Sequence, residues 1–443
     1  MPAAPQPSVF ADDVSPADAA AAWHKELFGM TPHQQAEAPA TWPVIGEHVD
    51  HAGGVVIMSV ASQRAAVAVS PREDQKFQIH FRRTGLADGS TDCSTFDEIA
   101  ELFSQQQPEV DETGKPTTPP LPRGGLAQRL GGIVWMMIQR QLLSRETSGM
   151  NIVVVSTISP DSGLGEYAAI DTALALALQA EAPDVDEAPL RARLAEVCAQ
   201  AGELFSGTAT LRARYSAALR GSGTQVAVID YADGSLTSAV HPVNRDLAAF
   251  AVAVPPIPQR AGKNEAQSAD TPAACPDQSD EIRTRNRFVD AARQAFGAQS
   301  LRLLPDAPAR VTQWLAAVHQ VHGAAGYPEL HESQTWLEFH AAETERVQRF
   351  AHALRSQRAR DIWALLQESQ RALQADYGLV AADELAQLCQ ARGAIGARAA
   401  AAGTSNAVIA YVDKKKAANF SSDLSADGLV VTQLFPGEIA KVL

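Results

Sequence analysis

The chain has 443 residues, of which 46% are hydrophobic and 20% charged. That length and composition indicate a globular protein with a sizeable core and about two or three domains. Its 37 Lys and Arg residues against 51 Asp and Glu residues leave a net charge of −14. This charge repels nucleic-acid phosphates and anionic membrane surfaces, so we expect neither as a partner. No signal-peptide pattern opens the chain and no run of about 18 apolar residues follows, so a cytoplasmic location is expected.

The cysteines show no pattern of a metal site or of a disulfide framework. They lie far apart and form no CxxC pair: Cys93, Cys198, Cys275 and Cys389. Isolated thiols are therefore expected.

The first half of the chain is predicted to mix strands and helices. Its β-branched segments predict three early strands, at Val55–Val60, Ala65–Val69 and Phe77–Arg82. Ser94 and Asp97 predict a capping box for a helix through Phe103. A helix over Leu126–Leu143, a strand over Asn151–Ser156, a glycine turn and a helix from about Tyr167 follow.

The second half is predicted to be mainly helical, with strands at both of its ends. Strands are expected at Gln225–Asp230, Ala248–Val254, Ala407–Val412 and Gly428–Gln433. Apolar periodicity predicts helices over Glu281–Gly297, Ala309–Val321, Thr335–Arg355 and Arg358–Asp376. The segments Ser104–Gly125 and Pro255–Asp280 are rich in Pro, Gly and polar residues and predict exposed loops. Without a regular alternation of strand and helix, the pattern favours an α+β fold over a doubly wound sheet.

One polar cluster stands in an otherwise apolar setting. Glu47, His48 and Asp50 fall within four residues and are followed by Gly53 and Gly54. Glycines allow a tight turn, and the acidic and imidazole groups could together bind a small polar ligand such as a sugar. The alternative is a solvated charged loop.

Two further segments are rich in glycine and small residues. Gly163, Leu164, Gly165, Glu166 and Tyr167 lie between a strand and a helix, where free backbone N–H groups at a helix N-terminus suit phosphate; a plain capping turn is the alternative.

The segment from Gly393 to Asn406, with Gly403, Thr404 and Ser405, allows close backbone approach to a ligand or to another element. A third pattern, His319 and His322 with His331-Glu332 after them, could indicate a metal site, although exposed helical histidines are the simpler interpretation.

Taken together, the three segments resemble the motifs of the GHMP sugar kinases, and specifically of the galactokinases. Ala38–Gly54 stands where the family has Ala-Pro-Gly-Arg-Val-Asn-Leu-Ile-Gly-Glu-His-Thr-Asp-Tyr-Asn-Gly-Gly. Gly163–Ala169 is similar to Gly-Leu-Ser-Ser-Ser-Ala-Ala, and Gly396–Asn406 more loosely to the third motif. His340–Val347 and the stretch from Leu366 to Tyr377 also look like galactokinase. The resemblance therefore spans nearly the whole chain.

This resemblance implies a two-lobed α+β fold with a ligand cleft between the lobes. The N-terminal lobe would comprise residues 1–229 and the C-terminal lobe residues 230–443, with a flexible loop at 255–280. A short C-terminal stretch would pack back on the N-terminal lobe. The family reaction is ATP-dependent phosphorylation of galactose to galactose 1-phosphate, with Mg²⁺ beside the triphosphate. Glu47, His48 and Asp50 match the family residues that hydrogen-bond the sugar.

The departures from the family fall on the chemistry. Thr41 stands at the position of the catalytic Arg, and Arg214 aligns with the catalytic Asp. An Arg stays protonated and cannot act as a general base. The second motif lacks its three serines, and Glu166 adds a negative charge there, although it could itself become a metal ligand. Ile282 replaces a Tyr that contacts the sugar.

Three functions are consistent with these residues. The first is a catalytically impaired galactokinase relative that binds a hexose or a sugar phosphate; the cationic Arg214 suits the phosphate. The second is an active ATP-dependent sugar kinase with a rearranged site. The third is an interaction protein that uses neither pocket. The sequence leaves the identity of any protein partner open.

Overall fold

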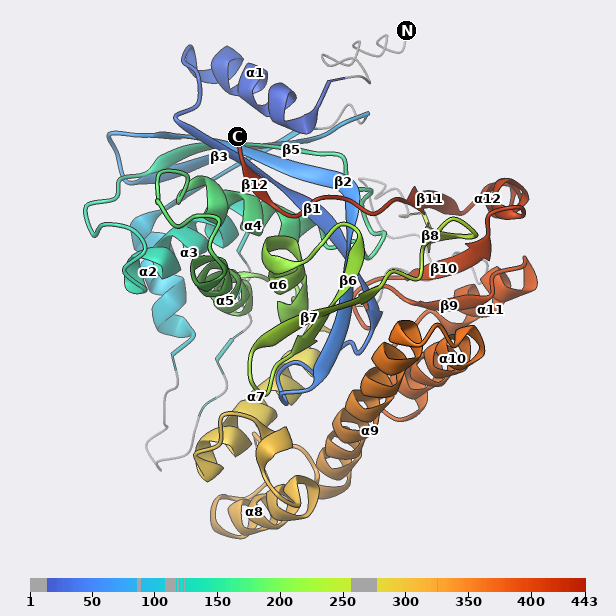
Figure 1. Cartoon of the computed structure of the whole chain (residues 1–443). Helices are drawn as coiled ribbons and strands as arrows, with labels where there is room; N and C mark the ends of the chain where they lie inside the picture. Colours follow the sequence, from blue (N-terminus) through green and yellow to red (C-terminus); the bar gives the residue numbers. More distant parts are fainter. Residues whose placement is uncertain are drawn as a thin grey trace, which may run out of the picture.

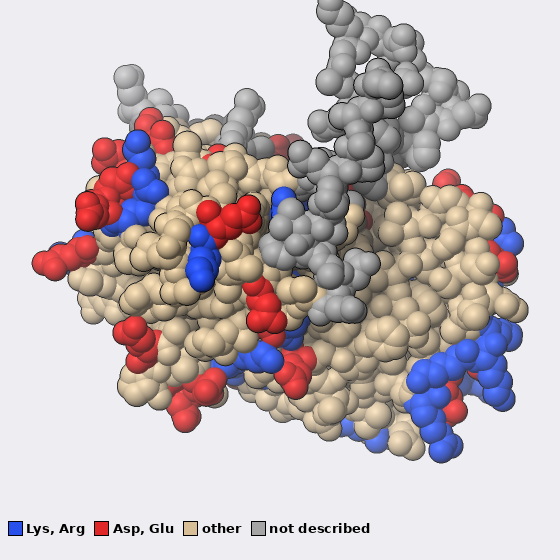
Figure 2. Space-filling model, turned by 90° about the horizontal axis from the view of Figure 1, so that it is seen from above, with Lys and Arg blue, Asp and Glu red and all other residues tan. Residues whose placement is uncertain are grey.

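The computed structural model describes residues 14–85, 89–107, 117, 119–120, 122, 124–255, 277–324 and 326–443. They form an α+β fold with two sheets (Figure 1), as the resemblance implies. No helix within these ranges is long and apolar enough to cross a membrane. Charge is unevenly spread: on the face seen in Figure 2, acidic side chains are prominent at one end and basic side chains gather at the other.

The larger sheet has the strand order β12-β1-β2-β5-β3-β4, and β6 and β7 extend it beside β2. Among the described residues, β3 and β5 pair in parallel, whereas the other neighbouring strands of this sheet pair antiparallel. Its strands are β1 (Gln34–Ile45), β2 (Val55–Pro71), β3 (Lys76–Arg83), β4 (Gly89–Thr95), β5 (Met150–Ser156), β6 (Gln225–Asp230), β7 (Ser235–Val240) and β12 (Lys441–Val442). Because β12 pairs with β1, the end of the chain packs back on this sheet, as expected.

Helices cover both faces of the larger sheet because side chains alternate along its strands. On β2, Ala66 and Ala68 pack against α1 (Pro16–Phe28), whereas Val67 faces the main core. That core lies beneath α2 to α6, on the opposite face from α1 (Figure 1). These helices are α2 (Phe96–Gln105), α3 (Leu126–Gln139), α4 (Glu166–Ala177), α5 (Ala188–Phe205) and α6 (Arg212–Arg220).

The smaller sheet has the order β11-β8-β10-β9 and is antiparallel. Its strands are β8 (Leu247–Ala253), β9 (Gly396–Ala399), β10 (Ala407–Asp413) and β11 (Val430–Leu434), and α11 (Asp383–Ala391) and α12 (Ala417–Ala426) share a core with it. The remaining elements are α7 (Ser279–Phe296), the 3₁₀ helix η1 (Leu301–Leu303), α8 (Ala307–His322), α9 (Leu330–Arg355) and α10 (Ala359–Ala375).

Most predicted elements are present, and their ends differ by a few residues. The strand Gln225–Asp230 is confirmed with its bounds unchanged. The prediction of two strands before and after residues 61–64 was wrong: the polar Ser62, Gln63 and Arg64 lie within the single strand β2, where Arg64 pairs with the buried Glu37. The helix expected over Leu126–Leu143 ends at Gln139.

The capping box and the loop predictions also need correction. The box is formed one residue later than predicted, by Thr95 and Glu98. Of the loop expected at 104–125, the first two residues belong to α2 and residues 108–116, 118, 121 and 123 lie outside the described part. Of the loop expected at 255–280, residues 256–276 lie outside it, and residues 279–280 open α7. The lobe boundary at 229/230 stays a prediction; β7, which follows it, pairs with β6.

Candidate functional site

The loop between β1 and β2, residues 46–54, carries the predicted sugar-binding side chains, and we call it the β1–β2 loop. Glu47, His48 and Asp50 are all buried, with 0%, 7% and 4% of their surface exposed. The loop turns at His48 (φ 68°) and Gly53 (φ 83°), both in the left-handed region. The alternative of a solvated charged loop is therefore wrong, because all three side chains are buried.

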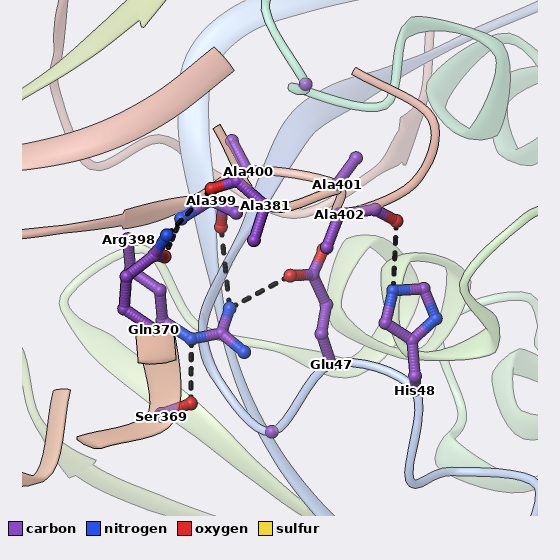
Figure 3. Close-up of polar contacts among 12 residues, drawn as sticks. Glu47, His48, Ser369, Gln370, Ala381, Arg398, Ala399, Ala400, Ala401 and Ala402 are labelled. Carbon is purple, nitrogen blue, oxygen red and sulfur yellow. Dashed lines mark hydrogen bonds and ion pairs between the residues drawn. The ribbon is translucent and has the colours of Figure 1, made fainter. Parts of the chain in front are cut away.

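Glu47 and His48 both reach the third motif (Figure 3). The Glu47 carboxylate accepts from Nη1 of Arg398 at 2.9 Å, and His48 Nε2 donates to the carbonyl of Ala402 at 3.1 Å. Arg398 is itself 1% exposed and its Nε donates to Ser369 Oγ at 2.9 Å. The structure thus joins two segments that the sequence analysis proposed as one site.

Three buried polar atoms near this loop have no hydrogen-bond partner in the described structure: Oδ2 of Asp50, Oε1 of Glu47 and Nδ1 of His340. Each unsatisfied buried group costs about 1–3 kcal/mol. Burial raises the pKa of the Tyr231 phenol, and the charge of Asp50 adds to that rise. Unpartnered acceptors of this kind are what ligand hydroxyl groups would satisfy.

The predicted phosphate loop runs from Gly163 to Tyr167. Gly163 and Gly165 have φ values of 68° and 70°, and no side chain caps α4 at its N-terminus. Leu164 is buried and its carbonyl accepts from the Thr41 N–H at 2.9 Å, whereas Tyr167 is 44% exposed. Open N–H groups at the start of α4 fit a phosphate group.

Glu166 does not stand alone in that loop. Arg83 of β3 holds its carboxylate with two nitrogens, at 2.6 to 3.0 Å, and the Glu166 side chain is 8% exposed. The hydrogen bond and charge of Glu166 raise the pKa of Arg83. The repulsion that Glu166 would exert on phosphate is therefore largely neutralised, and sequence reasoning missed this partner.

Arg214 occupies the centre of the three motifs. Its Nη1 donates to the carbonyl and hydroxyl oxygens of Thr41 at 2.5 and 3.3 Å, and its Nη2 to the carbonyls of Gly163 and Ala400 at 2.7 and 3.2 Å. Burial lowers the pKa of Arg214 to about 10, so it remains a cation at neutral pH. Thr41 and Arg214, the two residues that the resemblance aligns with the catalytic pair, are thus in direct contact.

The third motif touches the phosphate loop directly. A Cβ on Gly163 would lie 2.1 Å from the carbonyl oxygen of Ala400. Further along, Gly403 (φ 79°) lies against Ile282, and the Thr404 and Ser405 N–H groups donate to the carbonyl of Ala401. Ser405 Oγ finds no hydrogen-bond partner among the described residues. The close-approach interpretation of these small residues is confirmed for contact between elements.

The residues near the phosphate loop fit a phosphate better than a Mg²⁺ ion. The carboxylate of Glu166 is held by Arg83, and that of Asp171, one turn into α4, is held by the buried Arg129 at 2.6 Å. Within the described ranges, no group of three or more His, Cys, Asp or Glu residues could hold a metal ion, and this includes His319, His322 and His331.

Comparison with known proteins adds an independent line of evidence. A family model described as the galactokinase galactose-binding signature matches residues 22–71, which include the β1–β2 loop. The galactokinase of Streptomyces coelicolor is 24% identical over 394 residues, covering 88% of this chain and 87% of the relative. The human galactokinase is 25% identical over 367 residues, covering 83% and 79%.

Solved structures agree on the fold. The Lactococcus lactis galactokinase complexed with galactose superposes with a TM-score of 0.64 at 17% identity, covering 96% of this chain and 99% of that one. The Methanococcus jannaschii mevalonate kinase has a TM-score of 0.51 at 11% identity, covering 91% and 98%.

Proposed function

This chain is a member of the galactokinase family of GHMP kinases, and from that premise we propose that it binds a hexose without phosphorylating it. The family reaction is the ATP-dependent phosphorylation of galactose. The proposal has two halves: in the binding half the chain binds the same sugar as the family, and in the catalytic half it does not phosphorylate that sugar. The cytoplasm remains the expected location.

The observation that carries sugar binding is the unpartnered Asp50 carboxylate. Its Oδ2 is buried without a hydrogen bond from any described residue, in the segment matched by the galactose-binding signature. A hydroxyl group that donates to this oxygen would remove the cost of the buried acceptor and gain a charge-assisted hydrogen bond. Glu47 Oε1 offers a second acceptor of the same kind.

The loss of catalysis is supported by Arg214. The guanidinium stands where the resemblance expects the general base, and it cannot accept the proton of a sugar hydroxyl. Its four Nη donors point at Thr41, Gly163 and Ala400, so they are engaged before any ligand arrives. For the same reason the sequence argument that Arg214 favours a sugar phosphate loses its support, and we expect galactose to bind at least as well as galactose 1-phosphate.

The alternative is an active kinase with a rearranged site. It is supported by the uncapped N-terminus of α4 and by the names of the curated relatives. There the α4 N–H groups would hold ATP phosphates. The carboxylates of Glu166 and Asp171 are held by arginines, and Asp161, two positions before Gly163, is exposed. The Mg²⁺ that ATP carries would therefore be held mainly by the phosphates and by water, with Asp161 as the carboxylate next to the loop.

Two measurements on the purified protein test the proposal. Calorimetry with galactose is expected to show binding that Asp50→Asn weakens about tenfold or more, the worth of a hydrogen bond to a charged group. Asp233→Asn, an exposed carboxylate outside the site, is the matched control. Failure of galactose and other hexoses to bind would overturn the binding half.

The second measurement is ADP release with Mg-ATP across a panel of hexoses. No release above the rate without sugar is expected from the natural chain. Release that depends on a hexose and is lost in Asp50→Asn would overturn the non-catalytic half and establish the active-kinase alternative.

A further inference from the structure

A cavity of about 240 Å³ lies against the β1–β2 loop, on the side of η1, α8 and α9. Ala52 and Gly54 of that loop line one side, and Leu301 and Leu337 line others. Ala52, Leu301 and Leu337 also belong to one buried apolar cluster with residues of α7 and α8, so these walls are fixed by packing. The same segment is tied to the loop by Ser300 Oγ, which donates to the carbonyl of Ala52 at 3.2 Å.

The walls of the cavity are mainly apolar, and four of its lining residues carry polar side chains. Thr344 and His340, both on α9, line it and are buried. The charged residues of its lining are the exposed Arg302 and Asp306, and Arg302 is paired with Asp230 at 2.7 Å. A sugar ring needs hydrogen-bond partners for every hydroxyl, so these walls suit an apolar group better than the ring itself.

His340 connects the cavity with the proposed sugar site. It lines the cavity, its Nε2 lies 3.3 Å from the hydroxyl of Tyr377, and the ring of Tyr377 is 5.9 Å from that of His48. Asp50 is close enough for its charge to act on the His340 pKa, which burial lowers to about 3. The imidazole is therefore neutral, and its Nδ1 is buried without a partner.

We propose that the hexose bound at Asp50 carries a short acyl or alkyl substituent, and that this substituent fills the cavity beside Gly54 and His340. Gly54 lines the cavity and lies four residues from Asp50 in the same loop, so a substituent on a ring at Asp50 would reach the cavity along the loop backbone. His340 Nδ1 would hydrogen-bond the polar atom that links the substituent to the ring. The inference rests on the proposed binding of a hexose at Asp50 and specifies its class: a substituted hexose in preference to the unsubstituted sugar.

The test compares three ligands by calorimetry: galactose, N-butanoylgalactosamine and butyl β-galactoside. Each methylene moved from water into an apolar wall strengthens binding about fourfold. We therefore expect one of the two substituted sugars to bind about tenfold or more tightly than galactose.

A pair of variants locates the gain in affinity. Ala307 lies in the first turn of α8 and lines the cavity. The substitution Ala307→Phe therefore places an aromatic ring in the cavity. It is expected to abolish the preference for the substituted sugar and to leave galactose affinity unchanged. Ala309→Phe makes the same substitution at an exposed position of the same turn and is expected to keep the preference.

The outcomes separate the two proposals. Equal affinity for all three sugars, or a preference that survives Ala307→Phe, overturns this inference and leaves the proposed function intact. No binding of any of the three overturns both.

Discussion

At the scale of single residues, Arg214 shows how one side chain changes what a cleft can do. It takes the place that the resemblance gives to an acid and donates to the backbone of three separate segments, those of Thr41, Gly163 and Ala400. A carboxylate at this position could not donate a hydrogen bond to these carbonyl oxygens, because both groups are acceptors. The neighbouring Thr41 is small enough to leave the guanidinium room, so the two positions depend on each other.

This dependence predicts the stability of the reverting variants. Arg214→Asp should lower the free energy of unfolding by about 3–5 kcal/mol, because it buries an unpaired anion and leaves three carbonyls without donors. Adding Thr41→Arg should recover about half of the loss, because the new cation can pair with Asp and donate to the carbonyls. Urea unfolding measures both, with the exposed Arg245→Asp as control. A double variant as unstable as the sum of its singles would contradict this coupling.

Two buried histidines predict a loss of stability in acid. Burial lowers the pKa of His241 to about 4 and that of His340 to about 3, whereas both take up a proton near pH 6.5 once unfolded. The unfolded chain therefore binds more protons between pH 6.5 and 4, so stability is full above that window and is lost as the pH falls through it. Together they should cost about 2–4 kcal/mol between pH 7 and 5.

Urea unfolding at pH 7 and pH 5 measures this loss. His241→Gln and His340→Gln should each reduce the difference between the two pH values by roughly half, whatever they do to stability at pH 7. His352→Gln, at an exposed position of α9, should leave the difference unchanged. An undiminished difference in both buried variants would assign the acid sensitivity to other groups.

At the scale of elements, the phosphate loop is held by contact as well as by conformation. Gly163 has a positive φ and lies against the Ala400 carbonyl, whereas Gly234 has φ 71° with no atom within 4 Å of a Cβ. Gly234→Ala should therefore cost only the left-handed backbone, about 1 kcal/mol. Gly163→Ala should cost about 1–3 kcal/mol more, because the loop and the third motif must separate. Urea unfolding compares the two, and equal losses would show that the loop moves away freely.

The helices and strands were predicted correctly where the hydrophobic periodicity was uninterrupted. They were missed or divided where prolines or polar residues interrupt that periodicity and contacts in the folded chain accommodate them. β1 was missed because Pro39 and Pro43 interrupt it; the structure accommodates them at irregular positions in its pairing with β2, as proline lacks the N–H that a ladder needs. β2 was divided because polar residues lie in its middle, and only the folded chain supplies Glu37 as the partner for Arg64. A sequence pattern contains no such partner.

The candidate site was predicted by its motifs and incompletely by its charges. Glu47 and Asp50 were identified as a polar cluster among apolar residues, and Gly163 by its position in a glycine turn between a strand and a helix. The resemblance then implied that they belong to one site. Their partners were not identified, because Arg398 lies 351 residues from Glu47 in sequence and no local spacing connects them. The sequence did contain a signal for Arg398, because it is the third residue of the segment that resembles the third motif, after Gly396 and Ala397.

At the scale of the whole molecule, a buried ionic network joins the two sheets. Arg398 on β9 of the smaller sheet pairs with Glu47, which follows β1 of the larger one, at 2.9 Å. It also lies 3.6 Å from Glu343 of α9, which in turn contacts Arg346 and Ser369. Arg398, Glu47 and Glu343 are each at most 1% exposed. Such groups are costly to bury and costly to separate, so the network makes the position of Glu47 depend on the smaller sheet.

Arg398→Met tests this dependence, since it leaves Glu47 without its cation in a buried setting. It should lower the free energy of unfolding by about 3–5 kcal/mol and weaken galactose binding, because Glu47 would no longer be held in the β1–β2 loop. Arg392→Met is the matched control: its 2.7 Å pair with Asp427 is partly exposed on both sides, and exposed pairs contribute about 0–1 kcal/mol. Urea unfolding and calorimetry measure the two effects. If Arg398→Met were destabilised while its galactose affinity stayed unchanged, the network would hold the sheets together without positioning the sugar site.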